Sequence, residues 1–163
     1  MSSSDASDAD PPDGAGTVRR VLGSLQLPVA GAGVLVCFLA ASTFGSLLAE
    51  TPPGDGFLHG GALLLSYVLG VGGFALFALG LAIPPGSGFG IRFRRPQRGL
   101  FLVSAVAAVA SVVLPLAAFP TALGGDVTIV LVAWGLPTAV AVLGVASGLL
   151  WRAVERFRDR DYD

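Results

Sequence analysis

The sequence predicts an all-α integral membrane protein in which four transmembrane helices form an antiparallel bundle, with both termini in the cytoplasm. Four apolar runs, residues 28–49, 57–83, 100–119 and 127–151, each contain the roughly 20 residues that cross a bilayer, and none contains Asp, Glu, Lys or Arg. Charged residues make up 13% of the 163 residues, about half the share of a soluble domain. All ten cations are arginines, and they lie in three clusters outside the runs.

The residues that precede the first apolar run divide into two segments. Residues 1–16 consist almost entirely of Ser, Asp, Ala, Pro and Gly, and a segment with so little apolar surface is expected to form a disordered acidic tail. Residues 17–27 are expected to form a juxtamembrane amphipathic segment, which is either an interfacial helix or a helical lead-in to the first span. Its apolar face comprises Val18, Val21, Leu22 and Leu25, and its polar face Arg19, Arg20, Ser24 and Gln26.

Each apolar run is expected to be a helix, because backbone groups in hydrocarbon must satisfy their hydrogen bonds within the segment. Barrel strands would be about ten residues long and would alternate polar with apolar side chains, which these runs do not do. Pro28 suits the first turn of the first helix, where a missing N–H costs nothing. Residues 28–151 are therefore predicted to form the transmembrane domain, and residues 152–163 a charged cytoplasmic tail.

The arginines predict the orientation of the spans. They precede the first run, separate the second from the third and follow the fourth, whereas the other two loops contain no cation. With four spans, these clusters lie on one side of the membrane, and arginine excess marks the cytoplasmic side. We therefore expect a multi-pass protein of the cell membrane, and the absence of Lys with an excess of Asp over Glu favours a salt-adapted prokaryote with a GC-rich genome. The clusters are Arg19 and Arg20; Arg92, Arg94, Arg95 and Arg98; and Arg152, Arg156, Arg158 and Arg160.

The loop PPGSGFGIRFRRPQRG, residues 84–99, combines glycines with cations, as phosphate-binding loops do. A dinucleotide-binding loop, however, follows a strand and is followed by an acidic residue about 20 positions on, and a P-loop contains Lys. This loop meets neither requirement. We expect it to turn the chain in the cytoplasm and to contact anionic lipid headgroups. The candidate contacts are Arg92, Arg94, Arg95 and Arg98.

Small residues at four-residue spacing predict where the helices pack, because helices in lipid associate through close contact of small surfaces. Gly144 and Gly148 have this spacing in the fourth span, and Ser66 and Gly70 in the second. These contacts lie either inside one bundle or between copies in a homo-oligomer. Pro137 is expected to kink the fourth span and is a candidate hinge.

Other polar residues are weaker candidates for chemistry. Glu50, Asp55 and His59 come close together near the outer rim, but three residues without a fourth partner make a poor metal site, and solvation at the rim explains them. A single cysteine, Cys37, excludes an internal disulfide and is expected to be a small buried side chain. We expect no metal and no cofactor. Hydroxyl groups within the spans either line a substrate path or bond to helices; they belong to Ser42, Thr43, Ser46, Ser66, Tyr67, Ser104, Ser111, Thr128, Thr138 and Ser147.

The sequence favours a non-catalytic interaction or accessory protein of the membrane. An oligomeric small transporter or channel subunit is the alternative, although ion-coupled transporters usually carry an ionisable residue at depth. An intramembrane enzyme is the third hypothesis. It is the least favoured of the three, because the spans contain no carboxylate pair and no recognisable nucleophile with its base. The expected partners are the bilayer with its anionic headgroups, and a second copy or another membrane protein; nucleic acid is not expected.

Overall fold

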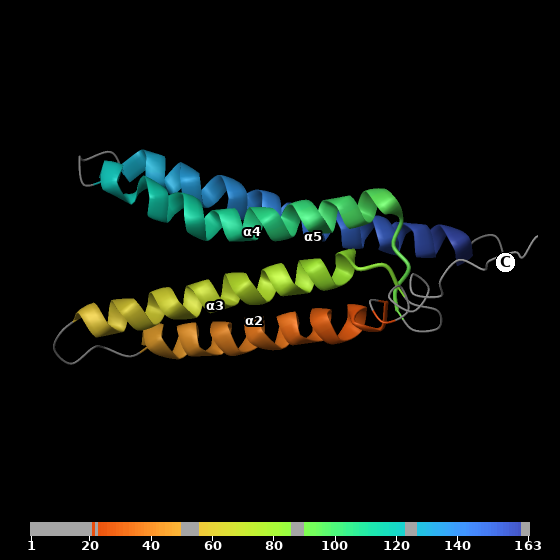
Figure 1. The fold of residues 1–163 in the computed structure, drawn as a ribbon, viewed down its shortest axis with the longest axis horizontal. Helices are drawn as coiled ribbons and strands as arrows, with labels where there is room; N and C mark the ends of the chain where they lie inside the picture. The colour runs from red at the N-terminus through yellow and green to blue at the C-terminus, as the bar shows by residue number, and fades with distance from the viewer. Residues whose placement is uncertain (1–20, 22, 50–55, 86–89, 123–126, 161–163) are drawn as a thin grey trace, which may run out of the picture.

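The computed structural model describes residues 21, 23–49, 56–85, 90–122 and 127–160. Four long α-helices make up most of this part of the chain: α2 (Gln26–Ala49), α3 (Gly56–Ala82), α4 (Arg95–Ala122) and α5 (Val127–Arg160) (Figure 1). Each is long and apolar enough to cross a membrane. The prediction of an all-α chain with four such helices is confirmed, whereas the predicted acidic tail lies outside the described residues.

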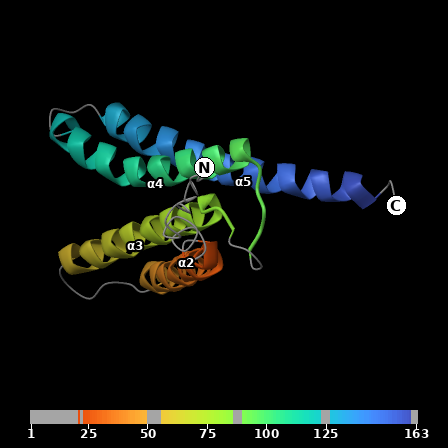
Figure 2. The same ribbon diagram turned by 45° about the vertical axis from the view of Figure 1, so that its right-hand side comes forward.

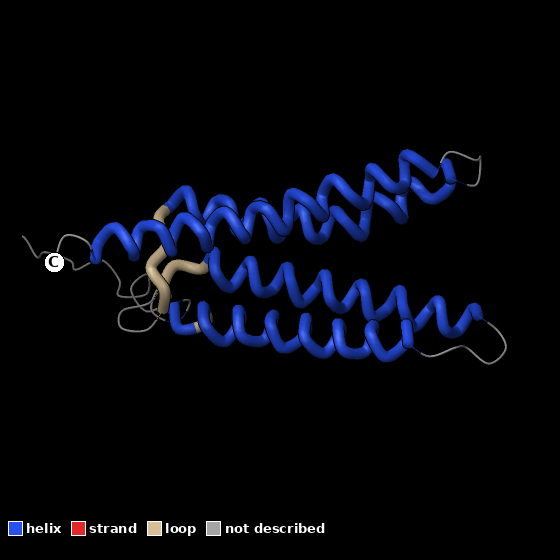
Figure 3. Tube along the Cα trace, turned by 180° about the vertical axis from the view of Figure 1, so that it is seen from behind, coloured by secondary structure: helices blue, strands red, loops and turns tan. Residues whose placement is uncertain are grey.

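The helices are arranged as two hairpins. α2 packs against α3 and α4 against α5, and the contact between α3 and α4 joins the two pairs. Chain direction alternates from one helix to the next, so that α2 and α4 begin, and α3 and α5 end, on the same side of the molecule (Figure 1). We call this side the arginine end and the opposite side the hairpin end. The two pairs stay separate in Figure 2, and they diverge toward the hairpin end in Figures 1 and 3.

Two helices extend beyond the predicted spans into arginine-rich sequence. α4 begins at Arg95, ahead of the predicted start at Leu100, and carries Pro96 in its first turn, where no intrahelical N–H bond is lost. α5 continues past Trp151 to Arg160. The polar termini of these two helices therefore lie together at the arginine end, where their side chains can pair.

Direct contact between helix backbones holds the α2–α3 hairpin together. A Cβ atom added to Gly33 would lie 2.6 Å from the carbonyl oxygen of Gly73. One added to Gly73 would lie 2.7 Å from the backbone nitrogen of Cys37, and one added to Gly80 would lie 2.7 Å from the Cα of Ala30. These distances leave no room for a side chain, so the three glycines permit an approach that other residues would prevent. We call Gly33, Gly73 and Gly80 the glycine seam.

In the α4–α5 hairpin, glycines pack against the side chains of the neighbouring helix. A Cβ added to Gly148 would lie 2.5 Å from Cε1 of Phe101, and one added to Gly144 would overlap the Ser104 hydroxyl. Phe101 is completely buried and meets Phe93 edge-on, with ring centroids 4.9 Å apart and an interplanar angle of 78°. The predicted pair of small residues in the fourth span thus faces α4 of the same chain.

Contact between the hairpins consists of side chains rather than backbone. A buried cluster joins Ala78 and Leu81 of α3 to Phe101 and Ala105 of α4 and to Val145 of α5. A second cluster continues this contact with smaller residues: Ala75, Ala107, Ala108 and Ala141. Because alanines form much of this interface, the hairpins touch without interlocking deeply.

The glycine seam makes a testable prediction about stability. Gly33→Ala should lower the free energy of unfolding by about 1–3 kcal/mol, because the added methyl group forces two packed backbones apart. Unfolding by SDS in mixed micelles, followed by circular dichroism, measures this change. Gly31→Ala is the matched control, because nothing lies within 4 Å of a Cβ there and alanine favours the helix. Equal stability of the two variants would contradict the prediction.

Candidate functional site

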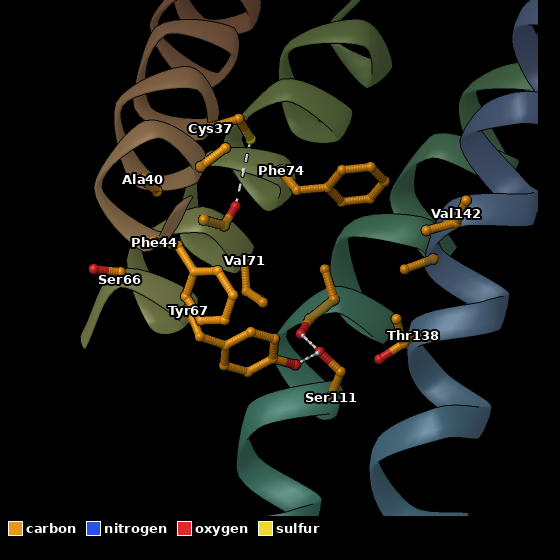
Figure 4. A pocket seen from close by; sticks show the side chains of 14 residues that line it. Cys37, Ala40, Phe44, Ser66, Tyr67, Val71, Phe74, Ser111, Thr138 and Val142 are labelled. Carbon is orange, nitrogen blue, oxygen red and sulfur yellow. Dashed lines mark hydrogen bonds between the residues drawn. The ribbon is translucent and has the colours of Figure 1, made fainter. Parts of the chain in front are cut away.

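An apolar groove of about 340 Å³ lies between the two hairpins (Figure 4). Residues of all four helices line it, with α2 and α3 on one side and α4 and α5 on the other. Its volume falls near the lower end of the range for small-molecule sites. Most of its surface is apolar and comes from side chains such as Ala41, Phe44, Val71, Phe74 and Val142.

Small residues explain why this space is open. Each helix contributes at least one to the lining: Ala40 and Ala41 from α2, Gly70 from α3, Ala108 from α4 and Ala141 from α5. The hairpins diverge toward the hairpin end, and these short side chains cannot bridge the widening gap (Figure 1). The groove is therefore a consequence of tight packing inside each hairpin and looser packing between them.

A chain of polar side chains crosses the groove at Tyr67. The indole N–H of Trp134 on α5 donates a hydrogen bond of 2.7 Å to the Tyr67 hydroxyl oxygen on α3. The Tyr67 hydroxyl lies 3.5 Å from Oγ of Ser111 on α4, toward which it points in Figure 4. Ser111 is buried and donates its own proton to the Ala108 carbonyl at 2.7 Å. The contact between the two hydroxyls therefore depends on the Tyr67 proton.

The other polar groups of the groove bond to backbone. Ser66 donates to the Ala62 carbonyl at 3.0 Å, and Thr138 to the Trp134 carbonyl at 2.7 Å. The Cys37 thiol donates to the Gly70 carbonyl at 3.4 Å. Ser66 and Thr138 thus bond to their own helices and also line the groove, so both uses predicted for the hydroxyls within the spans stay predictions. Among the residues that the structure describes, no charged side chain lines the groove.

The sequence-predicted packing and hinge residues lie in two places. Ser66 and Gly70 line the groove, whereas Gly144 and Gly148 face α4 away from it. Pro137 lies within α5, is buried, and directly precedes the groove residue Thr138. Its role as a hinge stays a prediction.

Sequence reasoning missed Trp134 and its bond to Tyr67. Both residues lie within predicted spans and away from the interfaces where Trp and Tyr are commonest. An indole N–H or a phenol in hydrocarbon requires a hydrogen-bond partner, so an aromatic residue of this kind inside a span was the available signal. The sequence contains no comparable signal for the hydrogen-bond partner, because the two residues are 67 positions apart.

At the arginine end, a buried glutamine fastens the α3–α4 connection to α2. The Gln26 amide donates to the Ile91 carbonyl and accepts from the Ile91 N–H, both at 2.9 Å. Gln26 is only 1% exposed, although the sequence placed it on the polar face of the segment 17–27. Gly90, next to this contact, has φ of +133°, a conformation that side chains rarely allow. Two hydrogen bonds from one side chain therefore hold the backbone of the connection at Ile91.

Glu155 of α5 is the centre of a second polar cluster at this end. Its carboxylate pairs with the Arg94 guanidinium at 2.9 Å and more distantly with Arg152 at 3.7 Å. It accepts hydrogen bonds from the Trp151 indole at 3.0 Å and from the buried Gln97 amide at 3.4 Å. Glu155 is 14% exposed. This carboxylate thus ties the start of α4 to the last turns of α5.

By spacing alone, Glu155 could pair along α5 with Arg158, one turn later. Glu155 pairs instead with Arg152, one turn earlier, and with Arg94 from the α3–α4 connection. The reason is that Glu155 faces the start of α4, where Arg94 and Gln97 lie.

The four arginines predicted to contact lipid headgroups have different environments. Arg94 is engaged by Glu155, although 70% of its side chain is exposed. Arg92 and Arg95 are exposed, and Arg98 is partly buried in the first turns of α4. Contact with headgroups stays a prediction for all four, and Arg92 and Arg95 are the most available for it.

The structure describes only part of two predicted clusters. His59 lies in the first turn of α3 and is partly exposed. Glu50 and Asp55, with which it was grouped, lie outside the described residues, as do Arg19 and Arg20.

The Glu155 cluster makes the second prediction. Glu155→Gln should lower the free energy of unfolding by about 1–2 kcal/mol, because a neutral amide loses the ion pair with Arg94 and offers one acceptor oxygen instead of two. Thermal unfolding in detergent measures the loss. Arg156→Gln removes an exposed charge one residue away and serves as the control. The role of Glu155 is refuted if the two variants unfold at the same temperature.

Comparison with known proteins adds no relative. No protein-family model, curated protein or solved structure matches the chain. The groove and the polar cluster at the arginine end are thus the features that bear on function.

Proposed function

We propose that this chain is a non-catalytic interaction protein of a cell membrane that holds an apolar component of the bilayer in the groove between its hairpins. The groove is the observation that supports this proposal most directly. It combines a volume of about 340 Å³ with an uncharged lining drawn from four helices. A bilayer supplies apolar molecules at this depth, and such a molecule would gain packing contacts with both hairpins at once.

The chemistry of the groove favours binding over catalysis. Cys37, Ser66, Ser111 and Thr138 each donate a hydrogen bond to a backbone carbonyl. An activated nucleophile would instead have a general base within hydrogen-bond reach. The lining offers shape and a small polar spot, which are the properties of a binding site.

We further propose that the helices form an antiparallel transmembrane bundle with both termini in the cytoplasm. Described arginines from the α3–α4 connection, the start of α4 and the last turns of α5 lie at the arginine end (Figure 1). Arginine excess is retained on the cytoplasmic side of membranes. The exposed side chains of Arg92 and Arg95 would meet anionic headgroups there.

The orientation is the third prediction. A reporter fused after Ser87 should have cytoplasmic activity, whereas fusions after Gly56 and after Gly125 should have the activity of the outer side. Alkaline phosphatase and green fluorescent protein fusions read the two sides in a complementary way. Reversed activity at any one of the three positions would reject the proposed orientation.

Occupation of the groove is the fourth prediction. An alkane that carries a photoreactive diazirine, added to the protein in lipid nanodiscs, should label groove residues saturably. Ala41→Phe should reduce this labelling several-fold, because Ala41 is exposed and lines the groove, so its larger replacement occupies the space. Mass spectrometry of the labelled peptides measures the change.

The control for this experiment is Ala32→Phe. Ala32 is exposed on the same helix, and nine residues at about 100° each place it opposite Ala41. Groove residues of the Ala32→Phe variant should be labelled to the same extent as those of the natural chain. Uniform labelling of lipid-facing surfaces that Ala41→Phe does not change would reject the proposal, and so would a co-purified polypeptide that shields the groove.

A further inference from the structure

The hydrogen-bond donors that face the groove are not equally engaged. Cys37, Ser66, Ser111 and Thr138 donate to backbone carbonyls, at 2.7–3.0 Å for the three hydroxyls. Tyr67 differs, because its hydroxyl lies 3.5 Å from Ser111 Oγ, whose own proton is donated to the Ala108 carbonyl. Hydrogen bonds between hydroxyl groups are normally 2.5–3.0 Å long. Among the described polar side chains of the groove, Tyr67 therefore holds the proton with the poorest acceptor.

The Tyr67 oxygen, in contrast, is well satisfied. It accepts the Trp134 N–H at 2.7 Å, and a hydroxyl that accepts a hydrogen bond becomes a better donor. The surrounding groove is apolar, and an unsatisfied donor is costly in such a medium. These two conditions together make the Tyr67 proton a strong and underused donor inside the groove.

We propose that the groove selects an uncharged, long-chain molecule that carries a hydrogen-bond-accepting oxygen, with a carbonyl as the best match, and that Tyr67 donates to this oxygen. This inference rests on the proposed binding function, and it adds the chemical class of the ligand. The ligand's oxygen replaces Ser111 as acceptor, and its apolar chain lies along the aromatic and aliphatic walls near Phe44, Val71 and Val142. An anion or a cation is disfavoured, because the described lining of the groove has no charged side chain to balance the ion's desolvation.

A competition experiment tests this selectivity. The diazirine alkane labels the groove of the full chain in nanodiscs, and unlabelled competitors of equal chain length, a methyl ketone and an alkane, displace it. The ketone should halve the labelling at a concentration about fivefold below that of the alkane, as expected for one net hydrogen bond.

Two variants and a control assign the preference to Tyr67. Tyr67→Phe should abolish the advantage of the ketone while leaving displacement by the alkane in place. Ser111→Ala should retain or increase the advantage, because it removes the competing acceptor. Thr43→Val is the control for loss of a hydroxyl within a span, because the Thr43 hydroxyl bonds to the Leu39 carbonyl and lies outside the groove.

The outcomes separate the two proposals. Saturable labelling with equal displacement by ketone and alkane overturns the selectivity and leaves the binding function standing. A ketone advantage that survives Tyr67→Phe, or that Ser111→Ala removes, also overturns it. Failure of the alkane probe to label the groove at all overturns the binding function and the selectivity together.

Discussion

The structure depends on how closely two helices approach when no hydrophobic force draws them together. In lipid, a leucine gains little by leaving the tails for a neighbouring helix, so contact must come from close packing. Gly33, Gly73 and Gly80 allow the backbones of α2 and α3 to touch, and Gly144 and Gly148 admit side chains of α4. Tight contact is thus confined to the interior of each hairpin. Each hairpin is therefore a closely packed unit, and other contacts hold the two hairpins to each other.

Several of the contacts that hold the hairpins to each other lie at the arginine end. Gln26 fixes the connection to α2, and Glu155 ties Arg94 to α5. The cluster of Leu81, Phe93 and Phe101 packs beneath these polar contacts. Toward the hairpin end the hairpins diverge (Figure 3), and alanines replace the larger side chains. The groove therefore lies beyond the polar contacts of the arginine end, where small residues leave space and the hydrogen bonds of Tyr67 cross between the hairpins.

The sequence predicts the helices well, because hydropathy and length act locally and hydrocarbon permits little besides a helix. It predicts individual contacts poorly. Gly144 and Gly148 stand out by spacing, but the glycine seam of α2 and α3 joins Gly33 to Gly73, and such pairs across helices leave no local pattern. Gln26 with Ile91 and Tyr67 with Trp134 are 65 and 67 positions apart. The ion pair of Glu155 with Arg94 likewise has no local pattern, because Arg94 comes from the connection between α3 and α4.

The polar spot of the groove has a structural consequence as well as a chemical one. Trp134, Tyr67 and Ser111 belong to α5, α3 and α4, so their hydrogen bonds span both hairpins. The 2.7 Å bond fixes Tyr67 to α5, whereas the 3.5 Å separation from Ser111 leaves the link to α4 slack. A ligand oxygen that takes the Tyr67 proton would replace this slack link with a stronger one while its chain fills the gap. Binding would then brace the two hairpins where the protein itself supplies the least contact, and the same hydroxyl would serve both recognition and packing.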